Sequence, residues 1–137
     1  SVPPPPPVVE AEPSEEERRK ERRKERRKRR RPKAMSATRL SQLWSSLEAA
    51  PFRDEKMIII RQISREDYLT SEQAEVFVKT LSFSDDKRDA ITTLYPKLID
   101  PEGVERLYRL LDHSSDRKKA RQEIDRINLH RRQNQGR

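Results

Sequence analysis

The hydrophobic residues between positions 36 and 128 follow the spacing of amphipathic helices. In the first segment, four apolar residues stand at i, i+3, i+4 and i+7 and so share one helix face: Leu40, Leu43, Trp44 and Leu47. Ser36 precedes them as a candidate N-cap, and Pro51 follows them as a helix terminator. The pattern predicts a first helix between Ser36 and Pro51.

A five-residue pattern recurs about every thirty residues: FRDEK from Phe52, FSDDK from Phe83 and a weaker HSSDR from His113. The segments TSEQAEVFVKTL from Thr70 and DPEGVERLYRLL from Asp100 also align, and both starting residues are candidate N-caps. The apolar faces match at equal offsets, for example Ile59, Ile60 and Ile63 with Ala90, Ile91 and Leu94. We therefore expect two successive helix pairs and a last helix with Ala120, Ile124 and Ile127 on its inner face.

Each five-residue pattern is interpreted as a helix start. Its acids fall in the first turn, where they meet free backbone N–H groups and the positive end of the helix dipole. Phe52 and Phe83 are expected to precede a polar cap and to close the turn as a hydrophobic staple. A metal or acid–base site would instead need histidine partners, and the two histidines, His113 and His130, lie in a cap position and a basic tail.

Several chemical functions are not supported by the composition. Cysteine is absent, which excludes disulfides, thiol nucleophiles and cysteine-bound zinc. Residues 100–112 have the length of a calcium loop, but they lack its ligand spacing, and Gly103 comes too early. The two glycines cannot form a phosphate-binding loop, and no apolar run approaches the roughly 18 residues of a membrane span. We expect no enzyme activity, catalytic residues, metal site or cofactor.

Charge is distributed unevenly along the 137 residues, of which 41% are charged and 31% hydrophobic. The net formal charge is +8, yet residues 35–116 are acidic overall, whereas residues 1–34 and 117–137 are strongly basic. Two basic arms around an acidic middle indicate a polyanionic partner.

Residues 1–14 are predicted to be a proline-rich extended segment. Pro3–Pro7 lack backbone donors and favour the polyproline II conformation. Such a rod either docks on an aromatic groove of the SH3, WW or profilin type or acts as a stiff spacer. Both interpretations stay open.

Residues 15–34 form a charged basic arm in which the period ERRK places glutamates three residues before lysines. A charged helix from Glu15 to Arg31, ended by Pro32, is one expectation, and a disordered arm is the other. The candidate polyanion-binding residues are Arg26, Arg27, Lys28, Arg29, Arg30, Arg31 and Lys33. The arm has no aromatic residue for base stacking, so contact with RNA or DNA would follow phosphate charge; the alternative is a solvated charge run.

Residues 36–128 are predicted to form one all-α domain, a compact array of five or six short helices built from helix pairs of about thirty residues. Residues 129–137 are predicted to be a basic disordered tail. Alignment of the two phenylalanine patterns sets Met57 opposite Arg88 and Ile58 opposite Asp89. Met57 and Ile58 are therefore candidate partner-binding residues, covered either by the preceding helix or by another protein.

The segments FRDEKMIII and LTSEQAEVFVKTLSFSDDKRDAITTLYPKLID, with the helix that follows, resemble a helical domain of unknown function, DUF4476. The resemblance covers about Thr38 to Ile124 and neither arm. This family occurs in secreted proteins of several bacterial groups and at the start of an animal proline- and serine-rich protein. It brings no established catalytic residues and implies an interaction or scaffold module. Localisation is therefore secreted if the bacterial pattern holds, and nuclear or ribonucleoprotein-associated if the basic arm is decisive.

Two functional hypotheses follow from the sequence. The first is a non-enzymatic protein-interaction or scaffold module whose basic extensions contact a polyanion. The second is a nucleic-acid- or ribonucleoprotein-associated structural protein that its basic arms anchor.

Overall fold

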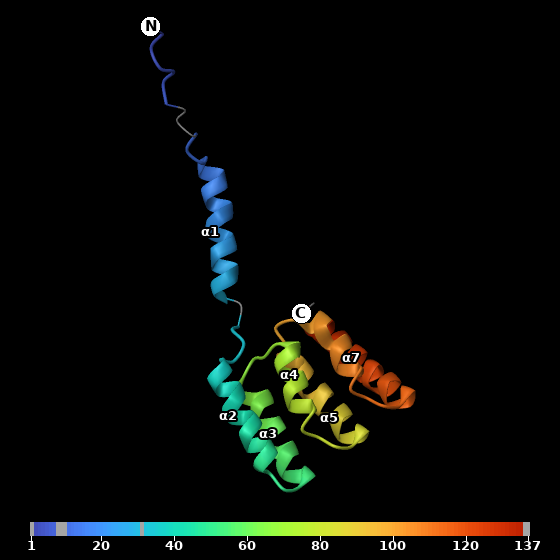
Figure 1. The fold of residues 1–137 in the computed structure, drawn as a ribbon. Coiled ribbons are helices and arrows are strands. Elements are labelled where there is room, and N and C mark those ends of the chain that lie inside the picture. Colours follow the sequence, from blue (N-terminus) through green and yellow to red (C-terminus); the bar gives the residue numbers. More distant parts are fainter. Residues whose placement is uncertain (1, 8–10, 31, 136–137) are drawn as a thin grey trace. The chain divides into compact units, whose positions relative to one another are not determined.

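The computed structural model describes residues 2–7, 11–30 and 32–135, and the side chains of residues 28–30 are not described. The chain divides into two compact units, Ser1–Pro32 and Lys33–Arg137 (Figure 1). As predicted, the fold is all-α. None of the helices in the described ranges combines the length and the apolar character that a membrane crossing requires.

Among its described residues, the first unit contains one helix, α1, which spans Glu15–Arg30. Ser14 begins it, because its side-chain oxygen accepts a hydrogen bond from the backbone N–H of Glu17 at 3.2 Å. Of the two states left open for the arm, the structure therefore has the helix; Arg31 lies outside the described residues. Pro3–Pro7 are exposed and form neither helix nor strand.

The second unit packs the remaining helices around one core (Figure 1). The α-helices are α2 (Ala37–Ala49), α3 (Arg53–Glu66), α4 (Ser71–Val78), α5 (Ser84–Leu94), α6 (Val104–Tyr108) and α7 (Ser114–Gln135). Two short 3-10 helices, η1 (Tyr95–Lys97) and η2 (Pro101–Gly103), connect α5 to α6. The largest fully buried side chains come from α2 and from both predicted helix pairs: Leu47, Ile60, Ile63, Leu69, Phe77, Val78, Ile91, Leu94, Leu107 and Leu111.

The predicted N-caps of α2 and α4 are confirmed. Ser36 accepts a hydrogen bond from the backbone N–H of Arg39, and Thr70 forms a reciprocal capping box with Gln73. Asp100 occupies the predicted N-cap position of η2, but its side chain does not cap the helix. The Asp100 carboxylate instead accepts two hydrogen bonds of 2.6 Å from the backbone N–H and the hydroxyl of Ser71. Asp100 therefore joins the start of η2 to the start of α4.

The predicted staples at the two phenylalanines are also wrong. Phe52 and Phe83 occupy the N-cap positions of α3 and α5, so Arg53 and Ser84 are already helical and no polar cap follows. A staple needs an apolar residue one position earlier, before the cap. Each phenylalanine is 68% exposed.

The prediction of a disordered tail at residues 129–137 is wrong up to residue 135, because α7 continues through Gln135. Tertiary contacts hold its last turns. The Tyr95 hydroxyl donates to Asn128 Oδ1 at 2.9 Å, and Arg131 donates to the carbonyl of Pro96 at 2.6 Å while it stacks over the Tyr95 ring. Residues 136 and 137 lie outside the described part.

Candidate interaction surfaces

The acids of the five-residue patterns lie in first helical turns, as predicted, but two of them are buried and bind arginines rather than backbone N–H groups. Asp86 of α5 is only 3% exposed, and its Oδ1 accepts hydrogen bonds from Arg53 Nε at 2.9 Å and Arg53 Nη2 at 2.5 Å. Asp116 of α7 is likewise buried and accepts from Arg88 Nη1 at 2.9 Å. These ion pairs join α3 to α5 and α5 to α7, so the two acids connect neighbouring helices.

The cation that ends each five-residue pattern binds a backbone carbonyl near the end of another helix. Lys56 Nζ donates to the carbonyl of Leu47, in the last turn of α2. Lys87 Nζ lies 3.5 Å from the carbonyl of Leu110, and Arg117 Nη1 donates to that of Leu111 at 2.7 Å. Carbonyls at helix ends lack partners within the helix, and these cations satisfy them.

No catalytic constellation emerges from the described residues. No group of three or more His, Cys, Asp or Glu side chains in this part of the chain could hold a metal ion. His113 and His130 are both exposed. A polar cleft of about 480 Å³ lies between α5 and α7, where acids and bases alternate and Asp86 is already paired with Arg53.

The structure separates the two residues predicted to bind a partner. Met57 is 3% exposed and belongs to the core, so its assignment as a partner-binding residue is wrong. Adjacent helical residues point about 100° apart, and Ile58 therefore faces outward, with 57% of its surface exposed. The alignment with Arg88 misled the prediction, because Arg88 reaches inward to Asp116 instead of facing water.

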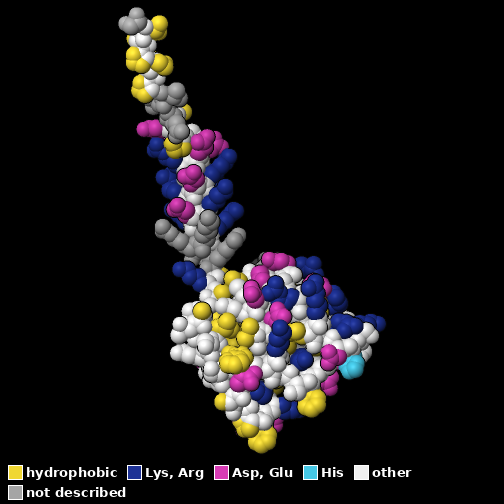
Figure 2. All heavy atoms as spheres, viewed as in Figure 1, with side chains coloured by type: hydrophobic (Ala, Val, Ile, Leu, Met, Phe, Trp, Pro, Cys, Tyr) yellow, Lys and Arg dark blue, Asp and Glu magenta, His cyan; other side chains and the backbone are white. Residues whose placement is uncertain are grey.

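Ile58 lies in a shallow groove of about 440 Å³ beside the turn between α2 and α3, together with Ala49, Ala50, Pro51 and Ile59. Pro51 also lines a smaller hollow of about 170 Å³ that reaches Leu81 and Phe83. We call this surface the apolar edge; it comprises Ala49, Ala50, Pro51, Phe52, Ile58, Ile59 and Phe83. Hydrophobic side chains stand out at the end of the domain where the α2–α3 and α4–α5 turns lie (Figures 1 and 2).

Comparison with known proteins identifies the domain. A family model described as Domain of unknown function (DUF4476) matches residues 34–124. The chain belongs to this family. The DUF4476 match extends from the residues before α2 into α7 and does not include α1. No curated protein and no solved structure matches the chain.

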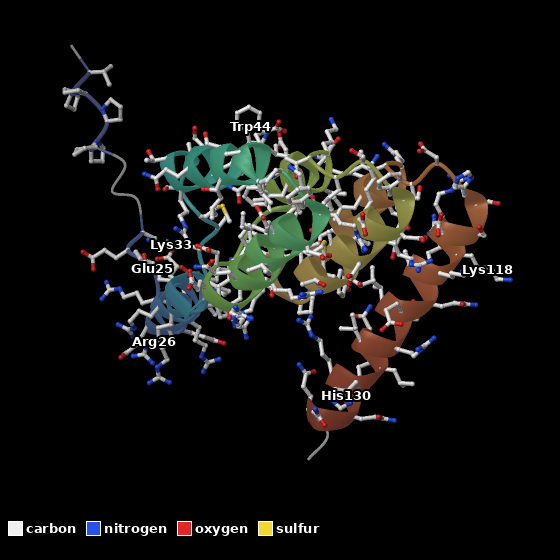
Figure 3. The ribbon with its side chains drawn as sticks, turned by 90° about the horizontal axis from the view of Figure 1, so that it is seen from below. Glu25, Arg26, Lys33, Trp44, Lys118 and His130 are labelled. Carbon is white, nitrogen blue, oxygen red and sulfur yellow. The ribbon has the colours of Figure 1, made fainter. Side chains whose placement is uncertain are left out.

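The basic arm lies outside the DUF4476 match. Arg26, Arg27 and Lys33 of the predicted polyanion-binding set are exposed, and Figure 3 shows the Arg26 side chain pointing away from α1. The side chains of Lys28, Arg29 and Arg30, and the whole of Arg31, lie outside the described residues. An exposed ion pair joins Arg18 to Glu12 at 3.7 Å, and the structure records no pair between the glutamates and lysines of the described arm.

The second basic region lies largely in α7 of the second unit, and its residues 117–124 fall within the DUF4476 match. Arg121 of α7 makes a two-pronged ion pair with Glu105 at 2.9 and 3.1 Å and stacks over the ring of Tyr108 at 4.5 Å. Burial raises the pKa of the Tyr108 hydroxyl to about 12, although the charge of Arg121 opposes this shift. Lys118 points outward in Figure 3 and, like Lys119, is exposed. Part of the basic charge predicted to contact polyanions therefore stabilises the domain.

Proposed function

We propose that the DUF4476 domain of this chain is a non-enzymatic protein-interaction module that binds a protein partner through the apolar edge. The observation that carries this proposal is the exposure of Ile58 within an apolar groove, together with the exposure of Phe52 and of Phe83, which lines the hollow that shares Pro51 with this groove. Contiguous exposed apolar patches are uncommon on monomeric proteins and commonly mark interfaces. Aromatic and large aliphatic side chains of this kind act as anchors when a partner buries them.

The arrangement of charges supports a binding role over catalysis. An acid or base in an active site needs a reacting group within reach and a perturbed environment. The two buried acids, Asp86 and Asp116, are instead occupied by Arg53 and Arg88. This arrangement favours a structural role for the charged pattern and leaves the apolar edge as the candidate functional surface.

A second function, contact with a polyanion, is favoured by the exposed cations of α1. The described arginines and lysines of this helix all face solvent, and the helix has no apolar face with which to pack on a core. Phosphate groups of RNA or DNA are the natural partners of such a helix. If this second function holds, the chain is a structural protein associated with nucleic acid or a ribonucleoprotein, and its basic arm anchors it there. A partner of the SH3, WW or profilin type for Pro3–Pro7 stays a prediction.

Deletion of residues 1–32 separates the two functions, because it removes the arm and retains all of the second unit. We expect the shortened protein to lose retention on heparin and RNA while it still captures the same protein partners after nuclease treatment. Loss of the protein partners on nuclease treatment alone would contradict the interaction module and favour the nucleic-acid-associated alternative.

A further inference from the structure

The apolar edge is bordered by charged residues of both signs, and the two cations that line its smaller hollow, Arg53 and Lys56, are already engaged within the domain. The Arg53 guanidinium donates two hydrogen bonds to Asp86. The Lys56 ammonium donates to the carbonyl of Leu47. A partner that needed positive charge at this surface would have to displace these contacts.

The acids at the same border are free of such contacts. Asp54 and Glu55 follow Phe52 in the first turn of α3, and Asp85 follows Phe83 in the first turn of α5. All three side chains are exposed; Glu55 lines the groove that contains Ile58, and Asp85 lines the near end of the polar cleft between α5 and α7. Within the described residues, the structure gives their carboxylates neither a hydrogen bond nor an ion pair. The unpaired charge that the first turns of α3 and α5 present beside Phe52 and Phe83 is therefore negative.

We propose that the segment docking on the apolar edge is a basic polypeptide, and this inference rests on the interaction function proposed above. Its apolar side chains fill the groove at Ile58 and cover Phe52 and Phe83. Its lysines or arginines meet the free carboxylates of Asp54, Glu55 and Asp85. Arginine fits best, because its planar guanidinium can pair with a carboxylate through two parallel hydrogen bonds. A nucleic acid or an acidic peptide would be repelled by these three carboxylates.

A display selection tests the proposal without assuming a partner. A random peptide library is panned on the full chain and counter-selected on the variant Phe52→Ser/Ile58→Ser/Phe83→Ser, which retains every charge of both units. The three side chains are exposed, so the variant should keep its fold, and its melting curve verifies this. We expect the peptides that bind only the unmodified chain to carry apolar anchors next to lysine or arginine.

A charge-neutralised variant then tests the carboxylates directly. Asp54→Asn/Glu55→Gln/Asp85→Asn should weaken such a peptide about 3- to 150-fold, the range expected for the loss of three exposed ion pairs. The matched control Glu102→Gln/Glu123→Gln/Asp125→Asn removes three exposed acids of η2 and α7 and should change affinity less than about twofold.

The outcomes distinguish this inference from the function on which it rests. Peptides that depend on Phe52, Ile58 and Phe83 but are acidic or uncharged would overturn the basic partner and leave the interaction surface standing. The same holds if both neutralised variants weaken binding equally. If no peptide distinguishes the chain from its serine variant, both the basic partner and the apolar edge as a docking site are overturned.

Discussion

Asp85 and Asp86 are adjacent acids with different roles. Asp86→Ala should lower the free energy of unfolding by about 1–3 kcal/mol, because it removes the buried acceptor of two hydrogen bonds from Arg53. Asp85→Ala should change it by less than about 0.5 kcal/mol, as expected for an exposed side chain. Chemical denaturation of the two single variants measures both values. Equal losses would show that general first-turn charge, not the Arg53 pair, accounts for the effect of the acids.

Tyr108 should make stability depend on pH at the alkaline end. Burial raises the pKa of its hydroxyl from 10.0 to about 12 in the folded domain. The unfolded chain therefore releases this proton first, so the contribution to stability is complete below pH 10 and is lost as the pH rises from about 10 to about 12. Across this range the unfolding free energy should fall more steeply for the natural protein than for Tyr108→Phe. Parallel curves would exclude this linkage.

Single residues also show what sequence could and could not predict. Ser36 and Thr70 were predictable as caps, because a cap depends on residues three positions away. The pair of Arg53 with Asp86 spans 33 residues, and only the packing of α3 on α5 brings the two together. Met57 was misassigned for the same reason, since the role of the aligned Arg88 depends on where α7 packs.

The starts of α4 and η2 approach each other too closely for a side chain at Gly103. The backbone N–H of Leu69 donates to the carbonyl of Lys97 at 3.1 Å, and a Cβ on Gly103 would lie 2.2 Å from Ser71 Oγ and 2.8 Å from Asp100 Oδ2. Gly103→Ala should therefore destabilise the domain by about 1–3 kcal/mol. Thermal or chemical unfolding measures this loss.

A second substitution identifies the cause of that loss. Ser71→Gly removes both the Oγ and the Cβ that the new methyl group would meet. The double variant Ser71→Gly/Gly103→Ala should therefore lose less stability than the two single variants together. Strictly additive losses would contradict a steric clash at this contact.

The helices themselves were largely predictable, because amphipathic spacing and terminators are local. The inner face of α7 agrees with the sequence, with Ala120 and Ile124 buried and Ile127 packed against the core. Its C-terminal end was not predictable, since residues 129–135 have little apolar periodicity and depend on the contact of Arg131 with Pro96. The outward orientation of Phe52 and Phe83 was not predicted. Each occupies the N-cap itself, one position later than the residue of a hydrophobic staple, and its side chain therefore faces outward.

The full chain combines a basic helix with a domain whose segment 35–116 is acidic overall. The salt dependence of DNA binding separates the contribution of the helix from that of the domain. If the arm engages about six phosphates, the logarithm of the binding constant for duplex DNA should fall with the logarithm of salt concentration with a slope near −5. Deletion of residues 1–32 should flatten that slope, and scrambling the DNA sequence should change little. A flat response, or unchanged binding after the deletion, would refute phosphate contact by the arm.

At the scale of the whole molecule, the all-α class and the membership of residues 34–124 in the DUF4476 family were predictable. Both depend on helix starts and core positions that are spread along this segment. The apolar edge was not, beyond Ile58. Its other members are separated in sequence, and Phe52 and Phe83 had a plausible structural role in the turns. Only the packed structure shows that Pro51 lines two hollows, one with Ile58 and one with Phe83, and that both phenylalanines stay exposed.

The most direct test of the interaction surface compares Ile58→Asp with Met57→Asp. Circular dichroism melting and nuclease-treated partner capture are measured on the same preparations. Met57→Asp should unfold the domain, because it buries an unpaired carboxylate in a small core. Ile58→Asp should melt like the natural protein and fail to capture its protein partners. A folded Ile58→Asp variant that captures the same partners in the same amounts would contradict the proposed interaction surface.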